Sequence, residues 1–262
     1  MEFCLKILNK EMQTKAVSHG EQEAFLVYSQ QYQEGDQIVL EISEKNRFVW
    51  FSVDDAKGKS LIFLTGSIFY RIPFGKNRIN ISPKVFHGEK HLIYVREARD
   101  FEVTAYYNLA ENVCDQHNIE NMYPHVTANV ETRDEAVFAA HNATDGIFAN
   151  TSHGEWPYES WGINQRKDAK LRIEYGRVVV IDRVILRIRA DFPHDSWWEN
   201  AKISFSDYSV QVISLTKTKD LQELTFAAIE TEWIEFHDLE KAEDASPFPA
   251  LVQIETYGRN KL

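Results

Sequence analysis

Tryptophan and charged side chains concentrate in two polar segments of the second half of the chain, residues 152–166 and 189–198. Five of the six tryptophans lie beyond residue 150, and four of those five fall in these segments. The face of an aromatic ring can stack against the C–H surface of a sugar, while Arg, Asp, Asn and His form directed hydrogen bonds with its hydroxyls. The composition of the two segments therefore predicts a carbohydrate-binding site.

We select eight side chains of these segments as the candidate ligand-binding set, because together they combine aromatic faces with planar polar groups. The set consists of Trp156, Tyr158, Asn164, Arg166, Arg189, Asp191, His194 and Trp197. A lone tryptophan can equally well fill the end of a β-sandwich with its N–H satisfied, and we interpret Trp161 in that way. The polar residues between the other tryptophans favour a binding site.

Carboxylates in the same segments leave a catalytic role open. Two of Glu155, Glu159, Asp191 and Asp195 could act as a general acid and base if they lay on opposite walls of a cleft. The sequence contains no nucleophile elbow, phosphate-binding glycine loop, HExxH or CxxC motif. We assign no catalytic residue and predict a non-catalytic binding protein. The alternatives are an intracellular enzyme that acts on a glycan fragment and an adaptor that binds a protein partner.

Strand-like runs indicate the fold of the first hundred residues. Residues 38–42, 48–51 and 61–64 are apolar or alternating, and segments with glycine beside polar residues separate them, where the chain can reverse. Strands at such regular spacing predict an antiparallel β-sandwich for residues 1–108. The polar stretch 9–22 is expected to be a loop or a short helix.

The sequence changes character between residues 109 and 135, where it is polar, rich in Asn and His, and poor in alternation. This segment is predicted to be an irregular linker. A short helical turn is expected at 136–141, and strand-like runs return from residue 171 onward. The absence of sustained 3.6-residue periodicity argues against a doubly wound α/β fold. We therefore predict an all-β protein with two antiparallel β-sandwich domains, residues 1–108 and 136–262.

A tight turn is predicted inside the second domain. Residues 171–174 and 180–189 are strand-like, and Tyr175-Gly176-Arg177 between them has the composition of a reversal. The two strands would then form an antiparallel hairpin, so that the start of the first lies near the end of the second. Because one polar segment precedes residue 171 and the other follows residue 189, the hairpin would bring both segments to one end of the domain.

The second half resembles the discoidin-like domain, also called the coagulation-factor type C domain. The resemblance covers roughly residues 142–258. It rests on Ala143-Thr144-Asp145-Gly146, Ser160-Trp161-Gly162-Ile163-Asn164, Ala169 to Gly176, Val180-Ile181-Asp182-Arg183-Val184-Ile185-Leu186-Arg187, Ile203 to Asp207 and Ile254 to Gly258. The resemblance implies a galactose-binding-like jelly roll, the fold that many carbohydrate-binding modules use.

Members of this family often hold a structural calcium ion beneath the loop that follows the Asp-Gly pair. The resemblance would place Asp145 and Gln253 at that site in this chain. Two departures stand out, because the family commonly has Glu where Gln253 stands and a polar residue where Ile147 stands. Calcium, which prefers oxygen ligands, is therefore a possible structural cofactor that the sequence leaves open.

The overall charge limits the classes of partner. The chain has 262 residues, with 40 acidic and 29 basic side chains and a net charge of −11, which disfavours nucleic acid and anionic membrane surfaces. Cys4 and Cys114 are too few for a disulfide framework and lack the spacing of a zinc site. The N-terminus lacks the pattern of a secretion signal, so a cytoplasmic location is expected. The oligomeric state is left open.

Overall fold

Strands make up most of the regular structure in residues 1–191 and 196–261, the part of the chain that the computed structural model describes. They form three sheets of four, five and eight strands, and every pairing between them is antiparallel. The all-β prediction is therefore confirmed. Helical segments are short: α1 (Asp100–Val103), and the 3₁₀ turns η1 (Gly75–Arg78), η2 (Thr132–Asp134), η3 (Ala136–Phe138) and η4 (Ala140–Thr144). None of the helices described is long and apolar enough to span a membrane.

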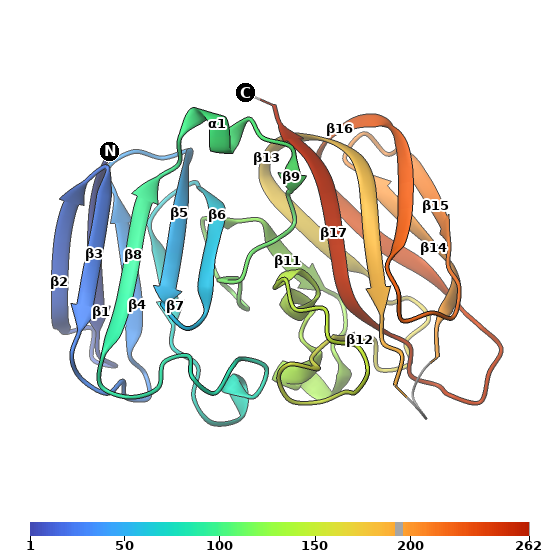
Figure 1. The fold of residues 1–262 in the computed structure, drawn as a ribbon, viewed down its shortest axis with the longest axis horizontal. Coiled ribbons are helices and arrows are strands. Elements are labelled where there is room, and N and C mark those ends of the chain that lie inside the picture. Colours follow the sequence, from blue (N-terminus) through green and yellow to red (C-terminus); the bar gives the residue numbers. More distant parts are fainter. Residues whose placement is uncertain (192–195, 262) are drawn as a thin grey trace.

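Two sheets form the N-terminal unit, whose strands run from blue to green in Figure 1. One sheet has the order β2-β1-β4-β7, and the other has the order β10-β6-β5-β8-β3. The strands are β1 (Glu2–Leu8), β2 (Thr14–Glu21), β3 (Glu23–Tyr28), β4 (Gln37–Ile42), β5 (Arg47–Asp54), β6 (Gly58–Leu64), β7 (Ile68–Arg71), β8 (His91–Glu97) and β10 (Met122–Tyr123). Their inward apolar residues form one buried core, as expected of a sandwich.

The expectation for residues 9–22 is wrong, because β2 occupies most of this stretch and pairs with β1 along its length. β2 lies at the edge of its sheet, and no residue of β2 is fully buried. An edge strand obtains its hydrogen bonds from one neighbour and needs little apolar sequence. This explains why the polar composition gave no strand signal.

The C-terminal unit is one strongly bent sheet of eight strands wrapped around a second core that includes Trp161, Trp198 and Phe236. Its strands are β9 (Tyr107–Asn108), β11 (His125–Ala128), β12 (Trp161–Gly162), β13 (Leu171–Ile188), β14 (Trp198–Phe205), β15 (Val210–Ser214), β16 (Gln222–Lys241) and β17 (Ala250–Asn260). Trp161 is fully buried and donates its indole N–H to Val130 O at 2.9 Å. Its predicted role as a core residue is confirmed.

The predicted hairpin does not form, because residues 171–188 are the single long strand β13. The chain passes through Gly176 with a φ of +66°, and the register against β16 shifts between Glu174 and Val179. The strand therefore bulges and bends without reversing. A Cβ atom at Gly176 would lie 2.4 Å from Cδ2 of Tyr123, so glycine serves a close approach between two segments here and not a turn.

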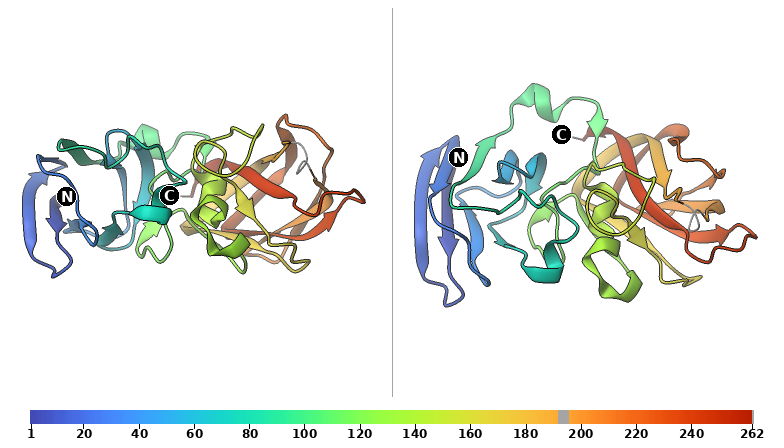
Figure 2. Two further views of the ribbon diagram at one scale, coloured as in Figure 1. Left: turned by 90° about the horizontal axis from the view of Figure 1, so that it is seen from below. Right: turned by 60° about the horizontal axis from the view of Figure 1, so that its bottom comes forward.

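Three short strands of the segment between the units join different sheets. β9 pairs with β17 and β11 pairs with β13, both in the C-terminal unit, whereas β10 pairs with β6 in the N-terminal unit. Figures 1 and 2 show the resulting arrangement, with the two units side by side and the green segment between them. The domain boundaries at residues 108 and 135 stay a prediction.

Candidate functional site

Three connections of the C-terminal unit meet at one end of its sheet. β12 pairs with the first residues of β17, and the same residues of β17 pair with the last residues of β13. The residues that follow β12, follow β13 and precede β17 therefore lie together. They surround a cavity of about 150 Å³, which we call the loop-end pocket; its lining comprises Thr132, Arg133, Phe138, His153, Gly162, Ile163, Asn164, Gln165, Arg189, Phe248, Pro249 and Ala250.

A buried ion pair between Arg189 and Asp191 borders the loop-end pocket. Arg189 Nε lies 2.7 Å from Asp191 Oδ1, and each side chain is only 4% exposed. Arg189 Nη2 also donates a hydrogen bond to Phe248 O at 3.0 Å, which ties the end of β13 to the loop before β17. Desolvation lowers the pKa of Arg189, while the neighbouring Asp191 carboxylate favours the charged form. Because both side chains are shielded from water, each charge is stabilised by the opposite charge of the other residue.

His153 extends this pair to the rim of the pocket. Its Nδ1 contacts Asp191 Oδ2 in a short hydrogen bond, while 40% of the side chain is exposed. A carboxylate on one ring nitrogen fixes the orientation of the imidazole. The buried pair thereby orients a partly exposed imidazole at the rim of the pocket.

Aromatic and amide groups complete the rim. The Phe138 ring lies under the Arg133 guanidinium, with 5.4 Å between the guanidinium carbon and the ring centroid, and Phe248 is 39% exposed. Asn164 and Gln165 both have positive φ, 48° and 60°, in the turn that follows β12, and both are exposed. The pocket thus sets apolar ring surface beside amide and imidazole groups, an arrangement that suits a hydroxylated ring.

The structure brings together three residues of the predicted ligand-binding set, Asn164, Arg189 and Asp191. Their two segments converge as expected, although through the β12–β17 pairing and not through a hairpin. His194 and Asp195 lie outside the described residues. Pocket residues that the sequence reasoning did not select are Phe138, His153, Gln165 and Phe248; only His153 and Gln165 carried a signal, since they lie inside the first polar segment.

Other members of the predicted set lie elsewhere. Arg166 is exposed and pairs with Asp168. Trp197 is half-buried against the core and lies under Lys217, whose Nζ is 5.2 Å from the indole ring centroid. The backbone of Trp156 donates to Ile79 O in the N-terminal unit at 2.9 Å. The loop that carries Trp156 therefore leaves the loop-end pocket and crosses to the other unit.

Tyr158 belongs to the same crossing loop. It is half-buried, its backbone N–H donates to Glu155 O at 3.0 Å, and it does not line the loop-end pocket within the described part of the chain. Trp156 and Tyr158 are thus separated from Arg189 and Asp191, although all four were expected to contact one ligand. Their position instead places the Trp156 ring between the two units.

Asp145 and Gln253 lie together, but they do not fit a calcium site. Gln253 Nε2 donates to Asp145 Oδ1 at 2.8 Å and to Asn142 O at 2.7 Å, so an amide N–H group faces the oxygens that a cation would need. Gln253 Oε1 accepts from the backbone of Gly146 at 3.2 Å, which fixes the orientation of the amide. Among the described residues, no three His, Cys, Asp or Glu side chains form a metal-binding group.

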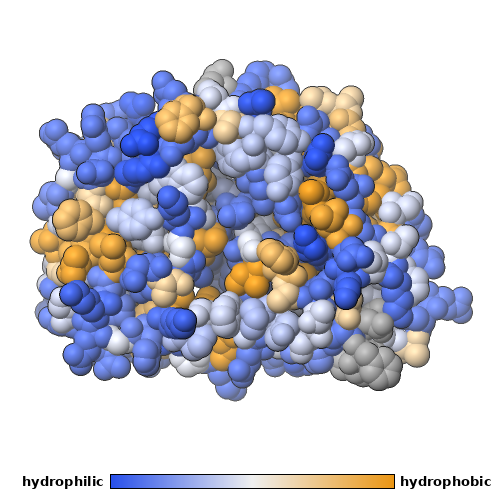
Figure 3. Space-filling model, viewed as in Figure 1, coloured by the Kyte–Doolittle hydropathy of each residue, from blue (hydrophilic) through white to orange (hydrophobic). Residues whose placement is uncertain are grey.

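A larger cavity system lies between the two units. Two cavities of about 540 and 360 Å³ share Lys57, Asn80, Ile81, Asp115 and His141, and we call them together the inter-unit cleft. Lys57, Asn80 and Ile81 come from the N-terminal unit, whereas Asp115 and His141 come from the segment that follows it. Figure 3 shows that hydrophilic side chains cover most of one face of the molecule, which is hollowed between the units.

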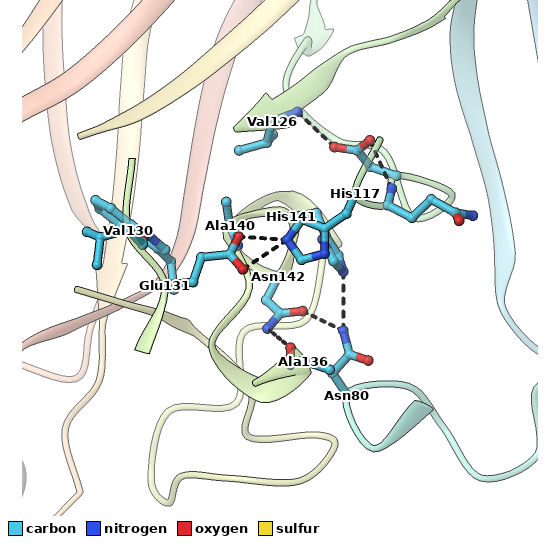
Figure 4. A network of polar contacts seen from close by, with 12 residues as sticks. Asn80, His117, Val126, Val130, Glu131, Ala136, Ala140, His141 and Asn142 are labelled. Atoms are coloured by element: carbon cyan, nitrogen blue, oxygen red, sulfur yellow. Dashed lines mark hydrogen bonds and ion pairs between the residues drawn. The ribbon is translucent and has the colours of Figure 1, made fainter. Parts of the chain in front are cut away.

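A polar network forms one wall of this cleft (Figure 4). His117 Nε2 lies 2.8 Å from Glu131 Oε1, and its ring meets the ring of His141 edge to face at 5.1 Å between centroids. Asn80 Nδ2 donates to His141 Nε2 at 3.3 Å and to Asn142 Oδ1 at 2.8 Å. The network therefore fastens the loop after η1 to η4 and holds the two units together at this wall.

Burial shifts the pKa values of several groups in and beside the cleft. It lowers the pKa of His141 to about 3, so the ring is neutral at physiological pH. It raises the pKa of Glu159 to about 7, and it raises the pKa of Asp145 well above its ordinary value, with the neighbouring Glu159 charge adding to the effect. Desolvation lowers the pKa of Lys57. His141 and Lys57 line both cavities and Asp145 lines the smaller one, which makes the cleft a second candidate site.

No family model matches the chain, and no curated protein matches its sequence. Solved structures match over part of it. Chitosan-binding module 1 of a chitosanase/glucanase from Paenibacillus sp. IK-5 is 19% identical and covers 59% of this chain and 100% of its own, with a TM-score of 0.41. The lectin domain of lectinolysin in complex with Lewis B antigen is 15% identical and covers 59% of this chain and 97% of its own, with a TM-score of 0.42.

A third match is the family 32 CBM from C. perfringens NanJ in complex with galactose. It is 15% identical and covers 50% of this chain and 91% of its own, with a TM-score of 0.39.

Proposed function

We propose that the protein binds a carbohydrate in the loop-end pocket and does not transform it. This proposal rests on the contacts that link Arg189, Asp191 and His153. The buried Arg189–Asp191 ion pair holds the imidazole of His153 in one orientation, in the pocket that Phe248 also lines. A side chain that other contacts already hold in one orientation loses less conformational entropy when it binds a hydroxyl than a flexible side chain does.

The size of the pocket sets the size of the ligand. Its volume of about 150 Å³ lies below the roughly 300–1,000 Å³ of sites that enclose drug-sized molecules. We therefore propose that the pocket takes a single sugar ring, such as the end of a glycan chain, with the rest of the chain in solvent. Phe248 would contact the C–H face of the ring, and His153 with Asn164 would bind its hydroxyls.

The pocket is poorly equipped for hydrolysis. No aspartate or glutamate belongs to its described lining, and the adjacent Asp191 carboxylate is engaged by Arg189 and by His153. Glycoside hydrolysis by the common route needs two carboxyl groups on either side of the bond to be cleaved. This supports a binding role over the enzymatic alternative.

Glycan-array screening followed by calorimetric titration of the best ligand tests the proposal. We expect His153→Ala and Asn164→Ala each to weaken binding about tenfold or more, which corresponds to about 1.4 kcal/mol. His87→Ala is the matched control, because His87 is also exposed but lies outside the pocket. Release of free sugar from the bound glycan would support the enzyme alternative, and the absence of any glycan ligand would favour the protein adaptor.

A further inference from the structure

Lys57 occupies an unusual position in the inter-unit cleft, where it lines both cavities. It lies in the turn between β5 and β6, and its backbone N–H donates to Asp54 O at 3.0 Å. Asp54 is buried and fixes the same turn by accepting from the backbone of Ala56 at 2.9 Å and of Phe86 at 3.2 Å. The backbone that carries the Lys57 side chain is therefore held rigidly at the edge of the cleft.

Within residues 1–191 and 196–261, the ammonium group of Lys57 forms no ion pair, although Asp145, Glu159 and Asp115 lie near enough for their charges to act on it. The Asp115 carboxylate in the same wall is already taken by His125 Nδ1 at 2.7 Å and by the backbone of Val126 at 2.8 Å. Lys57 is half-buried, and a partly shielded ammonium group without an ion pair is one that a bound anion would stabilise.

The described lining of the smaller cavity contains a second lysine and two acidic residues. Lys84 belongs to its lining, and the described residues offer Lys84 no ion pair either. The two lining acids are Asp115, which His125 compensates, and Asp145, which is held by hydrogen bonds from Ile147 N at 2.8 Å and from Gln253. In a protein with a net charge of −11, this cavity thus has two lysines without an ion pair among the described residues, beside two acids that are already engaged by hydrogen bonds.

Aromatic and amide groups of the same cavity indicate which groups besides an anion the ligand would contain. Trp156 is 38% exposed and is anchored to the N-terminal unit through its backbone bond to Ile79 O. Asn80 uses its amide N–H group on His141 and Asn142, which leaves its Oδ1 to accept from a hydroxyl. The cavity volume of about 360 Å³ is large enough to enclose a small ligand.

We propose that the inter-unit cleft is a second binding site, which takes a saccharide unit bearing a carboxylate, such as a uronic acid. The carboxylate pairs with Lys57, the sugar ring stacks on Trp156, and a hydroxyl donates to Asn80 Oδ1. This site shares no described lining residue with the loop-end pocket, so it does not depend on the function proposed there. Because both units contribute residues, the ligand also bridges them.

Calorimetric titration of the full chain with sodium D-glucuronate at pH 7 tests this inference, with D-glucose as the neutral counterpart. We expect Lys57→Met to weaken glucuronate binding at least tenfold, since it removes the charge and keeps the apolar stem. Lys59→Met is the matched control, because Lys59 lies two residues further on, at the start of β6, but its Nζ is 4.8 Å from the Trp50 ring centroid and it does not line the cleft. Trp156→Ala should also weaken binding, because it removes the ring on which the sugar would stack.

Several outcomes would overturn the inference. They are no binding of glucuronate by the native chain, equal binding of glucose, or equal binding by the Lys57→Met protein. Inorganic phosphate that binds as tightly as glucuronate would show that charge alone is recognised, which contradicts a saccharide site. Loss of glucuronate binding in His153→Ala but not in Lys57→Met would place the acidic sugar in the loop-end pocket, which refutes the second site and leaves the proposed function intact.

Discussion

Glu159 should be a destabilising residue at neutral and alkaline pH. Its side chain is 2% exposed, and neither carboxylate oxygen has a hydrogen-bond partner among the described residues. Burial therefore raises the pKa of Glu159 from its ordinary value of 4.5 to about 7. Glu159→Gln keeps the shape of the side chain and removes its ability to ionise.

The sign of the effect follows from proton binding. Between about pH 4.5 and pH 7 the folded state holds a proton on Glu159 that the unfolded state has lost, so stability falls as the pH rises through this window. Each pH unit is worth about 1.4 kcal/mol, and ionising Glu159 in the folded protein therefore costs about 3 kcal/mol at pH 8. The Gln variant should gain that amount at pH 8 and almost nothing at pH 4.5.

Urea unfolding of both proteins at pH 4.5, 6, 7 and 8 measures this difference. Glu155→Gln is the control, since Glu155 is an exposed acid of the same loop and should change stability at no pH. A constant difference between the native chain and Glu159→Gln across the series would refute the reasoning. So would a loss of stability at pH 8, which would show that the charge of Glu159 is needed by Lys57.

Three further predictions concern the fold and the pocket. Gly176→Ala should lower the free energy of unfolding by roughly 1–3 kcal/mol, because its Cβ would meet the Tyr123 ring; an unchanged urea midpoint would contradict this. Arg189→Met should cost about 3–5 kcal/mol by removing the buried counter-ion of Asp191, and Arg189→Met with Asp191→Asn should recover most of it in the same assay. Thermal unfolding should be identical in EDTA and in calcium, because Gln253 presents N–H groups to Asp145; a calcium-dependent midpoint would refute that geometry.

Local sequence patterns account for the fold class but not for every strand. Apolar alternation and glycine-containing turns predict the all-β architecture, because burial on one face of a sheet leaves that pattern in the sequence. The pattern fails at residues 9–22, where an edge strand needs little apolar sequence, and at Gly176. A glycine with positive φ can either reverse a chain or let another segment approach, and only the Tyr123 contact decides between the two.

The loop-end pocket was partly predictable for a related reason. Arg189 and Asp191 follow the end of a strand, where polar residues after an apolar run indicate a rim, and Asn164 lies in a polar turn. Phe138 and Phe248 reach the pocket from elements distant in sequence and carry no local signal. The inter-unit cleft could not be predicted, since Lys57 and His141 meet there only through the placement of the two units.

Chemical-shift mapping tests the central claim most directly. An amide spectrum of the labelled chain would be recorded while the best neutral glycan from the array is added. The account predicts that the largest shifts fall on His153, Asn164, Gln165 and the residues before β17, with the amides around Lys57 unmoved. Shifts that centre on the inter-unit cleft, or that spread over the surface without saturating, would contradict carbohydrate recognition in the loop-end pocket.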